Sequence, residues 1–209
     1  MSDEPTTHEL PDAAVLHERF FARWHRDDAR SHRATTGLRN DLESIPAFRG
    51  VDAAELCPLS PRAEENVKQQ IARMVAAARS DWNEIVAPHD VLSREGLAAI
   101  DASFDDSTLL DLITSSDPAD FANSFVVTCC ELGAVIGEAL RAARPGLAWV
   151  ADWPYWESAL VDRATGDAIP PFHWALKRLS ASSVRDGLHE GLVEKIGLAL
   201  SVLAKKSAR

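Results

Sequence analysis

The stretch "LGAVIGEALRAARPGLAWVADW", residues 132–153, changes its hydrophobic period midway, and this change decides the fold. In its first part, apolar residues recur at steps of three and four, as on the buried face of a helix: Leu132, Val135, Ile136 and Leu140. Pro145–Gly146 interrupts the helix, and alternate residues of 147–153 then share one face, as in a strand: Trp149, Ala151 and Trp153. The stretch predicts a long helix that leads directly into a sheet.

The regions on the N-terminal side of this stretch are predicted to be helical. Asp117–Pro118 is expected to open the helix, which then covers 118–143. Ser60–Pro61 is a typical helix start. An apolar stripe follows it: Val67, Ile71, Met74, Val75, Ala78, Trp82, Ile85 and Val86. Shorter helices are expected at 93–103 and 107–114.

The regions on the C-terminal side complete the sheet. Residues 157–162 are expected to form a second strand, "RATGD" at 163–167 a turn, and 168–169 a short third strand. Helices are predicted again from about residue 171. The predicted fold class is α+β, dominated by helices, with a small antiparallel sheet at about residues 147–170 packed against long helices. Residues 1–59 are expected to form a helical arm and linker, and 60–209 the core domain, although a single domain overall is also compatible with the length.

Two glycines in the 118–143 helix need a packing reason, because each costs about 1 kcal/mol of helix propensity. Gly133 and Gly137 are four residues apart and lie on nearly the same face. We expect Trp149 and Trp153 to pack beneath this face of the helix rather than to face solvent.

Composition excludes several classes of protein. The 209-residue chain has a formal net charge of −10, which argues against nucleic acid as a partner because phosphate contacts need a basic face. Its three cysteines cannot form a disulfide framework, since two of them, Cys129 and Cys130, are adjacent. No apolar run is long enough to span a membrane. We expect a cytoplasmic protein.

The aromatic run "WVADWPYW", residues 149–156, supplies one candidate binding surface. Tyr155 and Trp156 follow Pro154 at an expected bend, beside Glu157. If exposed, this pair could anchor a protein partner, since Trp and Tyr are frequent hot spots of interfaces.

Two carboxylates of the 118–143 helix supply the second candidate. Glu131 and Glu138 are seven residues apart and nearly aligned, and the apolar neighbours of Glu131 are expected to raise its pKa. The favoured interpretation is nevertheless a polar stripe, or pairing with Arg141 or Lys177. As an alternative, Glu138 and His173 could be the polar groups of a pocket between this helix and the hairpin.

A metal site has weaker support. His25, Asp28 and His32 would share one face of a continuous helix, and such a set can hold zinc or iron. The neighbouring charges in "RWHRDDARSHR" suit a solvated face equally well, and no second ligand set is apparent. The GxGxxG, GxxxxGK[ST], GxSxG and HExxH signatures are absent from the sequence. We therefore expect no metal and no cofactor.

The layout of residues 118–180 resembles that of uncharacterised bacterial proteins of unknown function. These have an LGxxxGExL helix, a hairpin that begins with tryptophan, and a PF…KRL segment. The matching positions are Leu132, Gly133, Gly137, Glu138, Trp149, Pro171, Phe172, Lys177 and Arg178. The resemblance implies no established activity. Some small acidic proteins of this general kind are immunity or accessory partners of secreted toxins, which is an analogy at the level of the fold.

These observations favour a non-catalytic, cytoplasmic protein-interaction module, such as an immunity-like or accessory protein, whose partner is another protein. The alternative is a small-molecule enzyme or ligand sensor with the pocket described above. A homodimer through the N-terminal helix is a further hypothesis, because Val15, Phe20 and Trp24 form a stripe that could pair across a two-fold axis.

Overall fold

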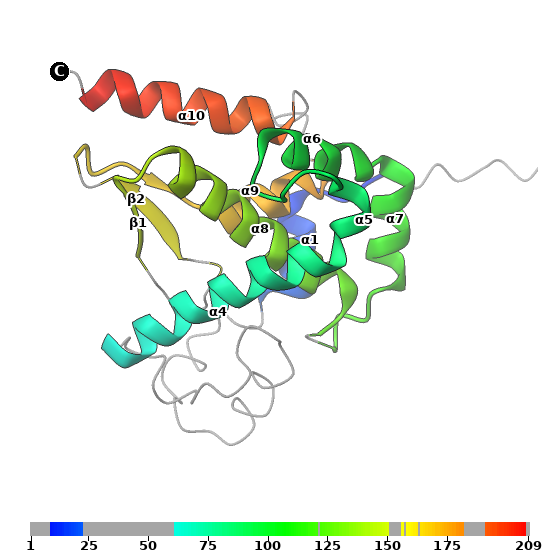
Figure 1. Ribbon diagram of the computed structural model, residues 1–209. Coiled ribbons are helices and arrows are strands. Elements are labelled where there is room, and N and C mark those ends of the chain that lie inside the picture. The colour runs from blue at the N-terminus through cyan, green and yellow to red at the C-terminus, as the bar shows by residue number, and fades with distance from the viewer. Residues whose placement is uncertain are drawn as a thin grey trace, which may run out of the picture.

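A computed structural model gives the fold of the described residues. These are residues 9–22, 61–120, 122–150, 156, 158–162, 164–181 and 191–207, with the backbone alone for 61–64. Helices dominate the described chain, and a small antiparallel sheet lies at one end of it (Figure 1). The predicted α+β class is confirmed.

The central element is helix α8, Ser124–Ala143, whose middle is buried on all sides. It begins six residues later than Pro118, because Asn123 rather than Asp117 caps it: the Asn123 side chain accepts a hydrogen bond of 2.9 Å from the Val126 N–H. Asp117 and Asp120 instead accept hydrogen bonds from the N–H groups two residues further on, at 2.8 and 2.9 Å. Such local bonds favour turns over helix, so the predicted start was wrong.

Helix α4, Pro61–Asp81, packs along α8 and is followed by the short α5, Asn83–Val86. The start at Pro61 and most of the predicted apolar stripe are confirmed, since the stripe residues from Val67 to Trp82 are buried. Ile85 is the exception, with 44% of its surface exposed. The helix breaks at Trp82, so Ile85 leaves the buried face while Val86 remains on it.

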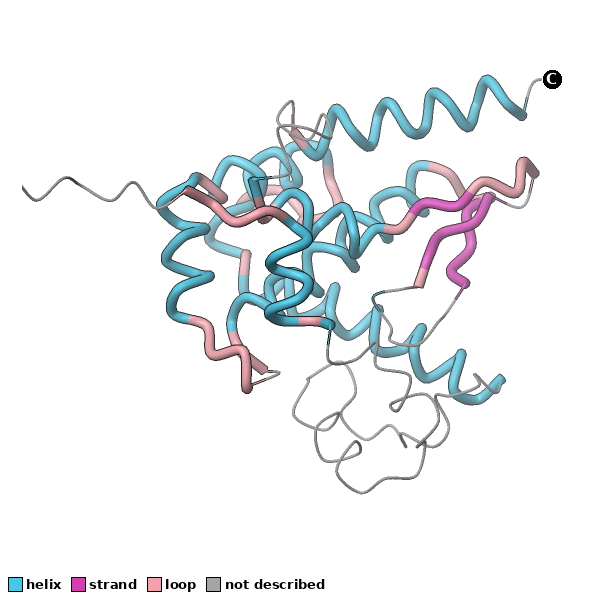
Figure 2. The backbone as a smooth tube through the Cα atoms, turned by 180° about the vertical axis from the view of Figure 1, so that it is seen from behind, coloured by secondary structure: helices cyan, strands magenta, loops and turns pink. Residues whose placement is uncertain are grey.

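The sheet contains β1, Leu147–Val150, β2, Ala159–Asp162, and β3, Ala168–Ile169, in the order β1-β2-β3. Both neighbouring pairs are antiparallel, and Trp149 lies opposite Leu160 in the β1–β2 register. The strands lie between α4 on the β1 side and α10, Leu192–Ser207, on the β3 side (Figures 1 and 2). The two outer strands therefore face different helices.

The remaining helices cover the other end of α8. They are α6, Arg94–Ser103, α7, Asp106–Ser115, α9, Pro171–Arg178, and α1, Ala13–Phe20. The Arg178 side chain joins α9 to α6: it pairs with the Asp101 carboxylate and donates to the carbonyls of Asp101 and of Phe104, just after α6, at 2.7 and 3.2 Å. The second Asp101 carboxylate oxygen accepts a hydrogen bond from the Leu192 N–H at the start of α10. Arg178 is thus a structural residue.

Helix α1 belongs to the same core as α8. The Phe20 ring is buried, and its centroid lies 4.7 Å from that of Phe125 on α8. The predicted stripe for homodimerisation was therefore wrong for Phe20, which is used inside the chain, while Val15 is exposed and Trp24 lies outside the described residues. Helix α1 is the described part of the predicted N-terminal arm, of which residues 23–59 lie outside the described residues.

The close approach predicted at the two glycines of α8 is confirmed. A Cβ at Gly137 would lie 2.2 Å from the Trp149 ring, and one at Gly133 would lie 2.4 Å from the Phe172 ring. Trp149 is correspondingly buried beneath the helix. Trp153 lies outside the described residues.

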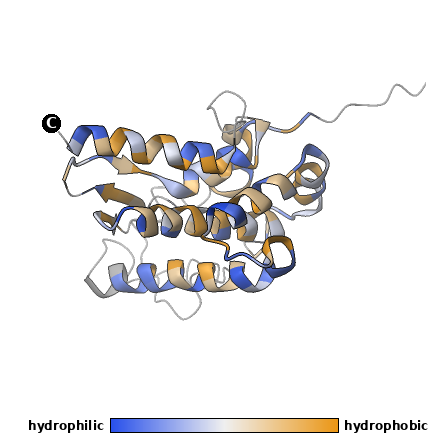
Figure 3. Cartoon of the chain, turned by 45° about the horizontal axis from the view of Figure 1, so that its top comes forward, coloured by the Kyte–Doolittle hydropathy of each residue, from blue (hydrophilic) through white to orange (hydrophobic). Residues whose placement is uncertain are grey.

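Hydrophobic residues concentrate on the strands and on α8, whereas α4 and α10 carry hydrophilic and hydrophobic bands in alternation (Figure 3). Such banding is typical of helices that bury only one face. Among the helices that the structure describes, none has the length and apolar character required to cross a bilayer.

Candidate functional site

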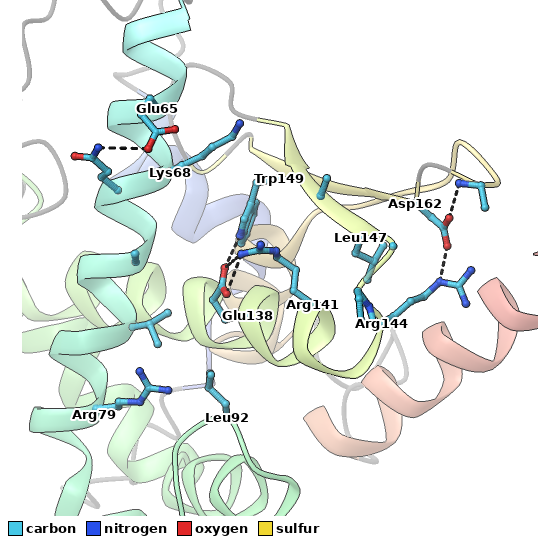
Figure 4. A pocket seen from close by; sticks show the side chains of 17 residues that line it. Glu65, Lys68, Arg79, Leu92, Glu138, Arg141, Arg144, Leu147, Trp149 and Asp162 are labelled. Atoms are coloured by element: carbon cyan, nitrogen blue, oxygen red, sulfur yellow. Dashed lines mark hydrogen bonds and ion pairs between the residues drawn. The ribbon is translucent and has the colours of Figure 1, made fainter.

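A groove of about 1160 Å³ lies between α4, the C-terminal end of α8, and β1 (Figure 4). One wall is formed by the polar face of α4, with Glu65, Lys68, Gln69, Ala72, Val75 and Arg79. The opposite wall comes from α8 and β1 and the turn between them, with Glu138, Arg141, Arg144, Pro145, Gly146, Leu147, Ala148 and Trp149. Leu92, Asp162 and Ala164 complete the lining at the two ends.

Trp149 fixes the position of β1 relative to α8. Its indole ring lies against Gly137, and its Nε1–H donates a hydrogen bond of 2.7 Å to the Glu138 carboxylate. The same carboxylate also accepts from Arg141 Nη1, at 2.8 Å to Oε1, which is the oxygen that Trp149 binds, and at 3.0 Å to Oε2. The three side chains form one cluster at the groove wall (Figure 4). The predicted pairing of Glu138 with Arg141 is confirmed.

A second ion pair ties the end of α8 to the sheet. Arg144 Nε donates to the Asp162 carboxylate at 2.5 Å, and its Nη2 donates to Ser207 of α10 at 2.6 Å. Burial alone would raise the pKa of Asp162, but the hydrogen bonds from the Ala164 N–H and from Arg144 outweigh burial and lower this pKa below its usual value. Asp162 is therefore a fixed anion at neutral pH, which suits a structural role.

A third pair lies near the far end of the groove. Arg79 Nε donates to Asp90 at 2.9 Å, and this hydrogen bond lowers the pKa of Asp90. Both side chains are about half exposed. Each of the three groove arginines is thus paired with one carboxylate.

Trp156 does not lie on the surface. Only 3% of it is exposed, and its ring packs edge-on against Phe21, with the centroids 5.1 Å apart at 73°. The prediction of an exposed aromatic anchor was therefore wrong for Trp156, because the Phe21 ring packs against it. Tyr155 and Glu157 lie outside the described residues.

His173 and Trp156 line a separate, mainly apolar cavity of about 190 Å³ between α1, α8 and α9. Cys129 and Cys130 of α8 also line it, but Glu138 does not. The single pocket predicted to contain both Glu138 and His173 is thus wrong. The physical reason is the helical period: nine residues from Cys129 to Glu138 correspond to about half a turn beyond two full turns, so the two side chains leave α8 on opposite sides.

The remaining reactive side chains of α8 are also buried. Burial raises the pKa of the Cys129 thiol well above its usual value, with a further contribution from Cys130, so this thiol stays protonated. Burial raises the pKa of Glu131 to about 7, with a smaller contribution from Asp81, as its apolar neighbours predicted. Neither residue lines the groove.

No cluster of three His, Cys, Asp or Glu side chains that could hold a metal ion occurs in the part of the chain that the structure describes. The weak candidate set His25, Asp28 and His32 lies outside that part.

Sequence reasoning found Glu138, Arg141 and Trp149 but missed the opposite wall of the groove. On α4, the polar residues beside the apolar stripe repeat at three- and four-residue steps, which is the signal that a second facing surface would give. Arg144 and Asp162 are 18 residues apart, and no local pattern connects them.

Comparisons with known proteins give no relative. No protein-family model, no curated protein and no solved structure matches the chain. The resemblance to bacterial proteins with an LGxxxGExL helix stays a prediction.

Proposed function

We propose that this protein is a non-catalytic interaction module that binds another protein in the groove between α4 and β1. The observation that carries the proposal is the groove itself, whose volume of about 1160 Å³ exceeds the 300–1,000 Å³ or so of a typical small-molecule site. An immunity-like or accessory protein is one form that such a module would take.

The chemistry of the groove favours binding over catalysis. Glu138, Asp162 and Asp90 each accept a hydrogen bond from an arginine, so each carboxylate is held as a partner of a cation. A general acid or base needs a pKa near the working pH, and the pKa values of Asp162 and Asp90 are lowered instead. The enzyme or sensor alternative is disfavoured, since its two polar groups line different cavities.

The charge and the thiols support the rest of the proposal. A formal net charge of −10 disfavours nucleic acid as the partner. Neither Cys129 nor Cys130 forms a disulfide in the described part of the chain, which suits a reducing compartment. We therefore propose the cytoplasm as the location.

Site-specific crosslinking in the cells that produce the protein tests this function. A photoreactive residue replaces Ala72, an exposed residue of the α4 wall, and in a matched variant replaces Ala98, which is exposed on α6 and does not line the groove. We expect one protein to be captured from Ala72 and not from Ala98. Equal capture from both positions, or none from Ala72, would overturn the proposal.

The captured protein is then purified, and its affinity is measured for the wild type, for Ala72→Trp and for Ala98→Trp. The indole at position 72 projects into the groove, so only Ala72→Trp should weaken binding, by at least about tenfold if the groove is the central contact. An unchanged affinity would show that capture at Ala72 is incidental.

A further inference from the structure

The β1 strand is an outer strand of the sheet, and its free side can be identified from the hydrogen bonds. Asp162 of β2 donates its N–H to Asp167 at 2.9 Å and accepts from the Gly166 N–H at 2.8 Å, so its backbone points toward β3. Backbone groups of successive strand residues point in opposite directions. Val161 and Ala159 therefore point toward β1, and they lie opposite Ala148 and Val150.

The same alternation turns the backbone of Leu147 and Trp149 away from β2. The Leu147 N–H is used in the turn after α8, where it donates to the Arg144 carbonyl at 3.0 Å. The Leu147 carbonyl and the N–H and carbonyl of Trp149 also point away from β2. None of these three groups pairs with another described strand. These three groups are directed to the side of β1 where the groove lies.

The other outer strand, β3, has a helix alongside its outer edge. Helix α10 lies alongside β3, where Lys206 forms an ion pair of 2.6 Å with Asp167, and Leu203 is buried (Figure 1). Proteins usually cover or charge the edges of their sheets, because an open edge pairs with other chains. Beside β1, in contrast, the groove separates the strand from α4.

We propose that an extended segment of the partner protein adds to β1 as a fourth strand inside the groove, and that a carboxylate of this segment binds Arg141. This inference rests on the function proposed above, and it specifies how the partner binds and which of its side chains is recognised. Strand addition of this kind obtains affinity from main-chain hydrogen bonds and specificity from side-chain pockets.

Arg141 supplies the specific contact. Its Nη1 is occupied by Glu138, whereas its Nε and Nη2 form no hydrogen bond with any residue that the structure describes, and 43% of the side chain is exposed. Glu138 thus holds the guanidinium in place, while the other edge can bind a carboxylate through two parallel hydrogen bonds.

The charge of the groove agrees with an acidic segment. Four basic side chains line it, Lys68, Arg79, Arg141 and Arg144, against the three acidic side chains Glu65, Glu138 and Asp162. The whole chain, in contrast, carries −10. An acidic segment is therefore repelled less in the groove than the charge of the whole chain alone would suggest.

The test uses a phage-displayed library of random dodecapeptides, selected on the full-length protein. We expect the selected peptides to share an Asp or Glu among residues of high strand propensity. Arg141→Glu should reduce their affinity by at least about tenfold, because a carboxylate then faces a carboxylate. Arg94→Glu, the same charge change on α6 outside the groove, is the matched control and should have little effect.

Methylation of one peptide nitrogen at a time tests the strand. In an added strand, only alternate N–H groups face β1. Binding should therefore be lost at two positions, two residues apart, whose N–H groups bond to the Leu147 and Trp149 carbonyls, and it should be retained at the position between them. Hydrogen exchange of the Trp149 amide should slow when the peptide binds. A peptide that needs Arg141 but tolerates methylation at every position would overturn the inference.

Failure of the inference is distinguishable from failure of the proposed function. If Ala72 captures a protein specifically, but no peptide is selected or methylation shows no alternation, the groove binds a folded surface and strand addition is wrong. If Ala72 captures nothing, the function itself is wrong.

Discussion

Glu131 and Glu138 lie seven residues apart on α8, but their carboxylates have different surroundings. Glu131 is 7% exposed, forms no hydrogen bond or ion pair with any described residue, and has a pKa raised to about 7. Glu138 is about a quarter exposed and binds both Trp149 and Arg141. The sequence places the two acids on nearly one line of the helix.

The spacing of two residues along a helix determines the direction of their side chains, but it does not determine which groups of other elements surround them. At Glu138 the chain returns as β1 and brings an indole N–H, and Arg141 lies one turn further along the helix. At Glu131 the facing residue of α4 is Asp81, another acid. One carboxylate therefore organises the groove wall, and the other destabilises the folded state when it ionises.

The largest expected effect is that of Glu131→Gln. The folded carboxyl keeps its proton up to about pH 7, whereas the unfolded one loses it near its ordinary value of 4.5, so the unfolded state is favoured as pH rises between the two. Above pH 7 the penalty is complete, and removing it should raise the free energy of unfolding by up to about 3 kcal/mol.

Urea titrations of the wild type and of Glu131→Gln, at half-unit steps from pH 4 to 8, measure this difference. The advantage of the variant should be absent below about pH 4.5 and grow up to about pH 7. Glu138→Gln is the matched control, since its carboxylate is stabilised by Arg141, and it should show no such advantage. If the difference in the free energy of unfolding between Glu131→Gln and the wild type does not change with pH, the raised pKa of Glu131 would be contradicted.

The next effect concerns the anchor of β1 beside Glu138. Gly137→Ala places a methyl group 2.2 Å from the Trp149 ring, which has little room to move because Gly137 and Glu138 both hold it. Such overpacking should cost about 2–3 kcal/mol of stability. Chemical denaturation measures the cost.

Gly197→Ala on α10 controls for helix propensity. A Cβ at Gly197 meets nothing within 4 Å, so this variant should gain about 0.5–1 kcal/mol. Two glycine substitutions of equal chemistry thus have opposite signs. A neutral Gly137→Ala would mean that β1 is not fastened to α8 at this point.

The helices could be predicted from the sequence where one apolar stripe decides the buried face. Pro61 as a start and the stripe along α4 are examples, and Gly137 predicted a close neighbour. The start of α8 could not be predicted, because Asp117 and Asp120 bond their own backbone while Asn123 takes the cap. Propensity alone does not rank these local alternatives.

Half of the candidate site could be predicted for the same reason. Glu138 and Arg141 are neighbours on one helix, and their pairing follows from spacing. Trp156 was placed wrongly because its cover comes from Phe21, 135 positions earlier in the chain. The polar repeat on α4 indicates a second polar face, but that this face lies across from β1 depends on tertiary packing.

The smallest expected effect tests the hydrogen bond that joins the groove wall to β1. Trp149→Phe removes the Nε1–H donor, and Glu138→Gln removes the charge of the acceptor. Each single variant also changes packing or the pair with Arg141, so the interaction itself is obtained from a double-mutant cycle, in which these other losses cancel. We expect a coupling free energy of about 1 kcal/mol, as for a hydrogen bond to a charged group that is partly solvated. A coupling near zero would show that Glu138 orients Arg141 but does not stabilise the position of Trp149. In that case the contact of the Trp149 ring with Gly137 would hold β1 to α8 at this point.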